Sequence, residues 1–81
     1  MADVTRETLV STLEEIALLL ELKGDNPFKT RAYRNGADVI QNFDGDIVGR
    51  AAANDLKGIK GIGDALQQKL YELASTGKLE Y

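Results

Sequence analysis

The feature that most restricts how this chain can fold is a cluster of glycines near its C-terminal end. Gly58, Gly61 and Gly63 lie within six residues of one another. Glycine loses more conformational freedom than any other residue when a helix fixes its backbone, so this density of glycines excludes one continuous helix through the segment. The chain must therefore turn here, and we expect the break at residues 61–63.

Before this turn, the sequence predicts a long amphipathic helix. Its apolar stripe consists of four aliphatic residues at offsets of 0, 4, 7 and 11, namely Leu9, Leu13, Ile16 and Leu20. This spacing places the four side chains on one face of a helix. Thr5 is the expected N-cap and Gly24 the expected left-handed stop, so the helix should cover about residues 5–23.

A second helix is predicted to begin at Asn26, which can cap it, and at Pro27, whose missing N–H costs nothing in the first helical position. Its expected apolar face consists of Phe28, Ala32, Val39, Ile40 and Phe43. We therefore expect the ring of Phe28 to lie in the core. Gly36, in the middle of this helix, predicts a close approach by another helix.

The rest of the chain is interpreted as a short connection followed by a last helix. A turn at residues 44–45 leads into the alanine-rich segment 47–54, which is either a short helix or a loosely helical link. Asp64 is the expected N-cap of the last helix, and Gly77 is its expected end. The apolar stripe of that helix is Leu66, Leu70, Leu73 and Ala74. Because no strand-like alternation occurs, we predict one compact all-α domain of four or five helices over residues 1–81.

Composition excludes several classes of function. A chain of 81 residues is long enough for one core only. The absence of cysteine and histidine excludes a disulfide framework, the usual zinc ligands and Cys-His catalysis. The longest apolar run, Ile16–Leu20, has five residues, far fewer than the ~20 of a membrane span, and no basic-plus-apolar leader precedes it. We expect a cytoplasmic monomer without side-chain metal ligands.

The net charge of −3 argues at first against a nucleic-acid partner, because phosphate binding usually requires a basic excess. The charge is, however, unevenly distributed. Residues 1–22 carry one positive and five negative charges, and residues 35–56 carry one positive and four negative. The intervening segment 23–34 and the segment 57–69 are basic. If the fold brings these two basic segments together, a local positive patch forms on an acidic body, and local potential matters more for binding than net charge.

The segment Leu56–Leu70 resembles the helix-hairpin-helix motif in its apolar positions and in its Gly-Ile-Gly turn. In this interpretation Gly61 and Gly63 leave room for a phosphate, Ile62 anchors the turn, and the N–H groups of the turn and of the next helical turn bind the phosphate. Such a site contacts the DNA backbone and predicts little sequence preference. The alternative is an ordinary tight turn that binds nothing. The Asp64 carboxylate would repel phosphate unless it is occupied as a cap.

Residues 24–40 resemble the second helix of the amino-terminal domain of X-family DNA polymerases, the polymerase-beta type of lyase domain, with the bacterial branch most similar. Together with the hairpin and the ending Thr76–Leu79, the resemblance covers most of residues 9–81. It implies a DNA-binding domain of a longer repair polymerase, or a free-standing relative, that grips the 5′-phosphate side of gapped DNA. It also implies covalently linked polymerase domains in the parent chain and a prokaryotic cytosol or nucleoid.

The resemblance also assigns roles to individual residues. Lys29, Tyr33 and Arg34 match the helix that lines the family's phosphate pocket, and Lys60 and Lys69 are expected to contact DNA as well. Some family members remove a 5′-deoxyribose phosphate through a lysine Schiff base, and Lys69 matches that lysine. The alternatives are that the cations form the solvated face of a helix and that Tyr33 is a core residue.

Three departures from the family pattern bear on the lyase chemistry. Ala65 replaces a second pocket lysine, Gln68 replaces an acidic neighbour of the nucleophile, and another pocket lysine would lie beyond Tyr81. An amine attacks an aldehyde only when it is unprotonated, which requires desolvation or neighbouring positive charge. The sequence therefore leaves open whether Lys69 is a nucleophile or a solvated lysine that contacts phosphate.

One cofactor is implied by the resemblance alone. A hairpin of this kind can hold a monovalent cation, Na⁺ or K⁺, at backbone carbonyls in the region of Ile59 and Gly61 when DNA is bound. Three functions thus remain open at this stage: a DNA-binding module, a 5′-deoxyribose-phosphate lyase, and a structural or protein-interaction domain. The net acidity favours the third.

Overall fold

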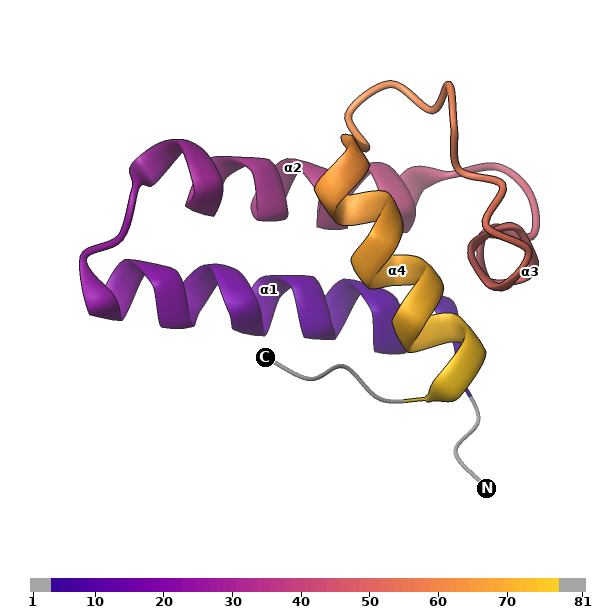
Figure 1. Cartoon of the computed structure of the whole chain (residues 1–81), viewed down its shortest axis with the longest axis horizontal. Coiled ribbons are helices and arrows are strands. Elements are labelled where there is room, and N and C mark those ends of the chain that lie inside the picture. The colour runs from indigo at the N-terminus through magenta and orange to yellow at the C-terminus, as the bar shows by residue number, and fades with distance from the viewer. Residues whose placement is uncertain (1–3, 78–81) are drawn as a thin grey trace.

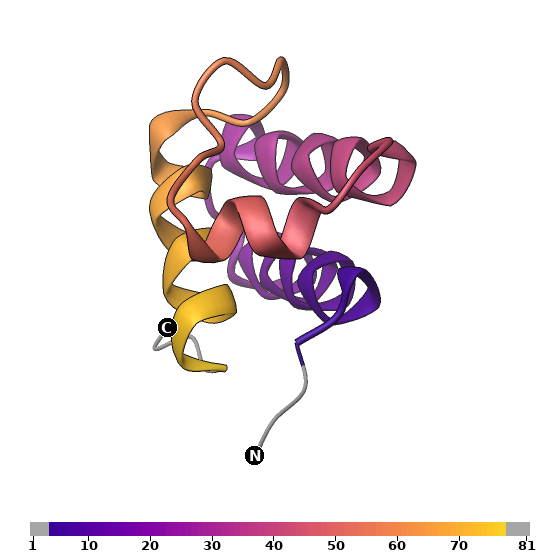
Figure 2. The same cartoon turned by 90° about the vertical axis from the view of Figure 1, so that its right-hand side faces the viewer.

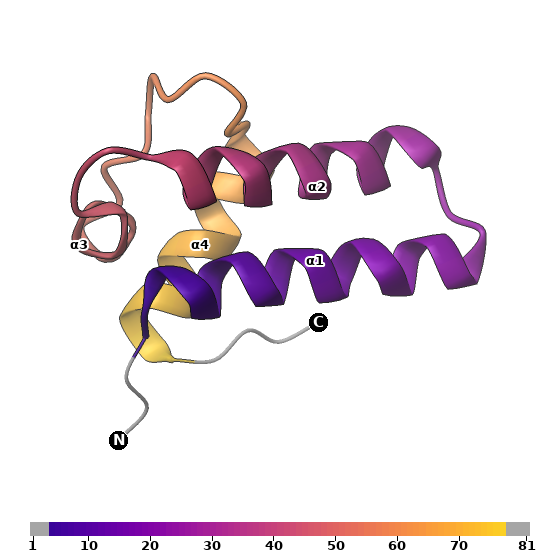
Figure 3. The same ribbon diagram turned by 180° about the vertical axis from the view of Figure 1, so that it is seen from behind.

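The computed structural model describes residues 4–77, which contain four helices: α1 (Arg6–Lys23), α2 (Pro27–Asn42), α3 (Ile47–Ala52) and α4 (Asp64–Thr76). No strand occurs in this range, so the predicted all-α class is confirmed. α1 and α2 run antiparallel as one layer, and α4 crosses them on one side, next to α3 (Figures 1 and 2). From behind, α1 and α2 lie in front of α4 (Figure 3). None of the helices in the described range has the length and apolar character to span a bilayer.

α1 begins and ends where its local sequence predicts. The Thr5 hydroxyl accepts a hydrogen bond from the Thr8 N–H at 3.2 Å, and the Thr8 hydroxyl accepts one from the Thr5 N–H at 3.2 Å. Gly24 ends the helix in the left-handed conformation, with φ of 70°, and its N–H donates to the Glu21 carbonyl at 3.1 Å. Both caps satisfy backbone groups that the helix itself leaves unpaired.

α2 begins as predicted, but the expected apolar face is partly wrong. The Asn26 side chain accepts a hydrogen bond from the Phe28 N–H at 2.9 Å, and Pro27 is the first helical residue. The buried residues of α2 are Tyr33, Gly36, Ala37 and Ile40. The expectation that Phe28 lies in the core is wrong, because its side chain is 74% exposed. α4 crosses α2 beyond its first turns (Figure 1), so the beginning of α2 has no helix packed over it on that side.

One apolar core fills the space between the two layers. Its largest fully buried side chains are Leu9, Leu13, Ile40, Ile47, Leu56 and Leu70. At the centre, a Cβ added to Gly36 would lie 2.8 Å from Leu66 Cδ1 and 3.5 Å from Leu13 Cδ1. The predicted close approach at this glycine is therefore confirmed, because side chains of both α4 and α1 pack against it. Each buried aliphatic side chain contributes roughly 1.5–3 kcal/mol to stability.

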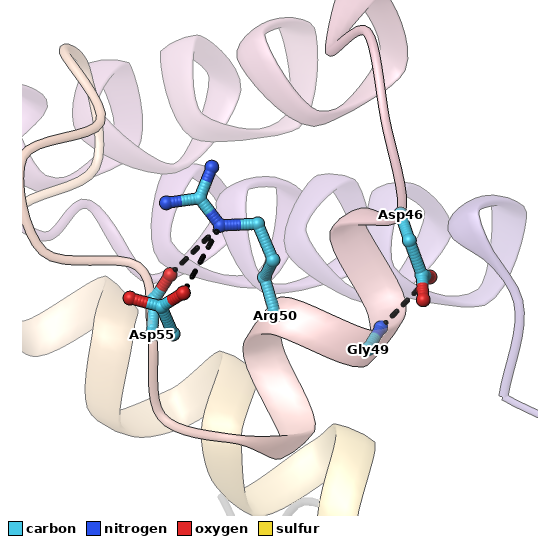
Figure 4. Close-up of polar contacts among 4 residues, drawn as sticks. All are labelled: Asp46, Gly49, Arg50 and Asp55. Atoms are coloured by element: carbon cyan, nitrogen blue, oxygen red, sulfur yellow. Dashed lines mark hydrogen bonds and ion pairs between the residues drawn. The ribbon is translucent and has the colours of Figure 1, made fainter.

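The short helix α3 leads into the hairpin, and Arg50 holds this connection. Asp46 caps α3 by accepting a hydrogen bond from the Gly49 N–H at 2.9 Å (Figure 4). Arg50 Nε donates to the Asp55 backbone carbonyl at 3.1 Å and lies 3.5 Å from Asp55 Oδ2 (Figure 4). The guanidinium carbon also lies 5.3 Å from the centroid of the Phe43 ring. One side chain thus links the end of α2, α3 and the start of the hairpin.

Candidate nucleic-acid interface

The glycine-rich segment forms two consecutive turns that are anchored in the core. The Ile59 N–H donates to the Leu56 carbonyl at 3.2 Å, and the Ile62 N–H donates to the Ile59 carbonyl at 3.1 Å. Leu56 and Ile62 are 1% and 5% exposed, whereas Lys60 and the glycines of the turn are exposed. The expectation that Ile62 anchors the turn is confirmed. The hairpin is consequently anchored in the core by Leu56 and Ile62, and its glycines and Lys60 face solvent.

The surroundings of Gly61 and Gly63 differ, although the sequence predicts that both glycines leave room for a phosphate. Gly61 has φ of +93°, and a Cβ added there would lie 2.7 Å from Val39 Cγ2. This glycine is therefore required by the turn conformation and by packing against α2. Gly63 has φ of −77°, and a Cβ added there would meet no atom within 4 Å. Of these two glycines, only Gly63 leaves open space in front of the backbone, which is the geometry that a phosphate needs.

α4 begins with an N-terminus that lacks a side-chain cap. Gly63 is the N-cap residue, and no side chain in the described range caps it by a hydrogen bond. The expectation that Asp64 is the cap is wrong: it is the first residue of the helix. The reason is that Gly63 already has the extended conformation of an N-cap, and its carbonyl accepts the first helical hydrogen bond from the Gln67 N–H at 2.9 Å. The positive end of the α4 dipole thus adjoins the open space at Gly63.

A hollow of about 390 Å³ lies between the start of α2, the start of α4 and the end of α1. Its lining residues are Leu20, Asp25, Lys29, Ala32, Tyr33, Ala65, Leu66 and Lys69. Three predicted site residues, Lys29, Tyr33 and Lys69, are therefore brought together from two helices that are distant in the sequence. Lys29 is exposed and Lys69 is half-buried, so the two ammonium groups differ in their access to water.

Tyr33 belongs to the core as well as to the wall of this hollow. Its side chain is 9% exposed and packs within the main apolar cluster. A tyrosine commonly buries its ring in this way while its hydroxyl takes part in hydrogen bonding. The two interpretations left open by the sequence, core residue and pocket residue, are therefore compatible.

Arg34 does not line this hollow, although the sequence groups it with Lys29. Its guanidinium Nη2 forms an ion pair with Glu21 Oε2 at 2.9 Å, and both side chains are about half exposed. Arg34 instead lines a separate depression between α1 and α2, together with Arg31 and Asn35. Five residues along a helix correspond to a rotation of about 140° around its axis, so Lys29 and Arg34 point to different sides of α2.

Asp25 is a lining residue of the hollow that the sequence reasoning did not single out. It lies in the loop between α1 and α2, four residues before Lys29, and its Oδ1 accepts a hydrogen bond from the Asn26 N–H at 2.6 Å. The sequence could have indicated this residue, because Asp25 lies next to the N-cap of the helix that carries Lys29. The hollow consequently contains a carboxylate in addition to its two lysines.

The sequence profile of the helix-hairpin-helix domain family matches residues 5–79, and the chain belongs to this family. Over 73 residues it is 33% identical to the DNA polymerase/3′-5′ exonuclease PolX of Bacillus subtilis (strain 168). That match covers 90% of this chain and 12% of the relative, so the chain spans only a small part of the relative's length. The resemblance to X-family DNA polymerases is thereby confirmed. Among solved structures, none gives a significant match.

Proposed function

We propose that this chain binds the sugar-phosphate backbone of DNA as a helix-hairpin-helix domain of an X-family DNA polymerase, and that it favours gapped DNA with a 5′-phosphate. The observation that carries the proposal is the uncapped start of α4, where Gly63 leaves the backbone accessible. The family match and the similarity to a PolX polymerase support the choice of DNA as ligand.

Two adjoining elements would hold the DNA in different ways. The N–H groups at the start of α4 would donate to a backbone phosphate, assisted by the helix dipole and by the nearby Lys60. The hollow lined by Lys29, Tyr33 and Lys69 would receive the phosphate at the 5′ end of the gap. Both elements recognise phosphate rather than base edges, so we expect little sequence preference and strong salt dependence.

The test is a binding titration with a short gapped duplex, with and without the 5′-phosphate, at two salt concentrations. We expect tighter and salt-sensitive binding to the phosphorylated gap. Lys29→Ala and Lys69→Ala should each weaken binding and reduce the slope of log K against log salt by about 1. Arg34→Ala is the matched control, because it removes a cation from α2 that does not line the hollow. Absence of salt-sensitive binding would instead favour a structural or protein-interaction domain.

A second candidate function is 5′-deoxyribose-phosphate lyase activity with Lys69 as the nucleophile. It is favoured by the surroundings of Lys69, which is half-buried in a hollow with the apolar walls Leu20, Ala65 and Leu66. The Lys69 amine would add to the sugar aldehyde and lose water to form an imine. Borohydride reduces such an imine to a stable amine adduct, so trapping that persists in Lys69→Ala would exclude Lys69 as the nucleophile.

A monovalent cation, Na⁺ or K⁺, is a further part of the proposal. The carbonyl oxygens of the turn have the hard oxygen chemistry that suits such an ion. The Ile59 carbonyl accepts one hydrogen bond, from the Ile62 N–H, which leaves a second lone pair for a ligand. The Ile59 and Gly61 carbonyls would then help to hold the ion. Replacing K⁺ by a large organic cation at constant ionic strength should weaken DNA binding if this ion contributes.

A further inference from the structure

Three leucines of α1 are exposed on the side of the helix that faces away from the core. Leu18, Leu19 and Leu22 are 50%, 40% and 75% exposed, whereas Ile16 and Leu20 of the same helix are buried. Leu18 lies two residues from both buried positions, and two residues correspond to a rotation of about 200° around a helix. Leu22 follows Leu18 by four residues and Leu19 by three, so the exposed side chains are neighbours on the helix surface. These three leucines form the leucine patch.

The fold leaves this part of the domain uncovered. The half of α1 that leads into α2 extends beyond α4 (Figures 1 and 3), and the leucine patch lies in this half, close to the end of α1 at Lys23. Glutamine has nearly the same helix propensity as leucine, so an exposed position in α1 does not require an apolar residue. Single exposed leucines are common, but adjacent ones form an apolar patch of the kind that marks an interaction surface.

The charges around the leucine patch indicate which chemistry it can bind. Glu14 and Glu15 are exposed and lie one helical turn before Leu18 and Leu19. Neither glutamate forms an ion pair within the part of the chain that the structure describes. Lys23, one turn after Leu19, has an interaction of its own. Because these carboxylates repel DNA phosphates, the patch fits a protein surface with an apolar centre and a basic rim.

The size of the leucine patch limits the kind of partner further. Its exposed surface amounts to less than that of two fully exposed leucines. A stable interface between free proteins buries about 800 Å² on each side, from about 20–30 residues. A patch this small can hold a partner only if a covalent linkage raises the effective concentration of that partner. In the PolX relative the matched segment makes up 12% of the chain, so a domain of this kind is attached there to a much larger body of protein.

We infer that the leucine patch docks onto the body of the polymerase chain that carries this domain, at an apolar surface with a basic rim. The inference rests on the proposed function as a domain of an X-family polymerase, and it adds an intramolecular contact to that function. Leu20, which lines the hollow, is rotated by about 200° around α1 from both Leu18 and Leu22. The docked domain therefore keeps the hollow open to DNA.

The test uses Bacillus subtilis PolX in which this chain replaces the segment that it matches, prepared as a protein with full polymerase activity. The measured quantity is the rate of hydroxyl-radical labelling of individual side chains. Labelling of Leu18 and Leu22 should be slower in the chimera than in the isolated chain by about threefold or more, because side chains at the centre of an interface pack as densely as a protein interior. Tyr71 of α4, which is 36% exposed and lies outside the patch, is the internal reference and should be labelled equally in both proteins.

A double variant shows whether the leucines themselves hold the contact. Leu18→Gln with Leu22→Gln should restore the labelling of Leu19 in the chimera to its rate in the isolated chain. In the isolated chain the same double variant should keep the wild-type urea midpoint and DNA affinity, because neither residue lines the hollow. Tyr71→Gln is the matched control, because it removes an exposed apolar side chain from another helix and should leave the patch protected.

The outcomes separate this inference from the proposed DNA binding. Protection of the leucine patch that the double variant removes and Tyr71→Gln does not remove supports the docking. Equal labelling of the patch in the chimera and the isolated chain overturns it, and salt-sensitive binding of the isolated chain to gapped DNA would then leave the DNA-binding proposal intact. Sedimentation of the isolated chain as a dimer that the double variant dissociates also overturns it, because a second copy would then cover the patch. A protected patch in a chain without salt-sensitive DNA binding would refute the DNA-binding proposal alone.

Discussion

The replacement of Gly61 by alanine tests how the hairpin is held against the rest of the domain. Gly61 has φ of +93°, and its added Cβ would lie 2.7 Å from Val39 Cγ2. A left-handed backbone costs a residue with a Cβ roughly 1–2 kcal/mol. Val39 is β-branched and stiff at χ1, so relieving the contact adds an overpacking cost of about 1–3 kcal/mol. We expect Gly61→Ala to lower the free energy of unfolding by about 2–5 kcal/mol.

Urea denaturation measures this loss directly. A domain of this size has a total stability of about 4–12 kcal/mol, and with a slope near 1 kcal/mol per M the midpoint should fall by about 2 M or more. Gly58→Ala is the matched control, because Gly58 has φ of +89° but no atom within 4 Å of its added Cβ. Gly58→Ala should lower the free energy of unfolding only by the backbone contribution of roughly 1–2 kcal/mol. Adding Val39→Ala to Gly61→Ala should recover part of the stability. Equal midpoints for the two single glycine variants would refute the argument.

Three further changes probe the interface and its support. Gly63→Ala should alter the free energy of unfolding by less than about 1 kcal/mol, because the added Cβ meets open space. The same variant should bind DNA more weakly in a salt titration, and an unchanged affinity would show that phosphate does not approach Gly63. Phe28→Ala should leave the urea midpoint nearly unchanged, since the ring is 74% exposed, whereas a loss of about 3–5 kcal/mol would mean that it is a core residue. Arg50→Ala should lower the free energy of unfolding by about 1 kcal/mol and increase the rate of amide hydrogen exchange in the hairpin. A variant with wild-type stability and wild-type exchange rates would contradict the link between Arg50 and Asp55.

The start of α4 shows how a local prediction can place a boundary correctly and still assign the wrong cap. Asp64 has the side chain of a good N-cap, and the sequence places the helix start within one residue of the observed one. The turn conformation decides the actual cap, because Gly63 reaches the extended backbone that an N-cap needs. The consequence is functional in two opposing ways. The first N–H groups of α4 have no side-chain cap among the described residues, so they can donate to a ligand, but the Asp64 carboxylate at the same helix start repels a phosphate.

The sequence alone determined the local features of the fold. These features follow from hydrogen bonds and backbone preferences within a few residues: the caps at Thr5, Gly24 and Asn26, the break at the glycine turn, and the end of α4 at Gly77. The tertiary structure decided the rest. It placed Lys29 of α2 and Lys69 of α4 at one hollow. The reason is that the two lysines lie on different helices, and where α4 lies relative to α2 depends on packing between residues that are distant in the sequence, including Leu66 against Gly36.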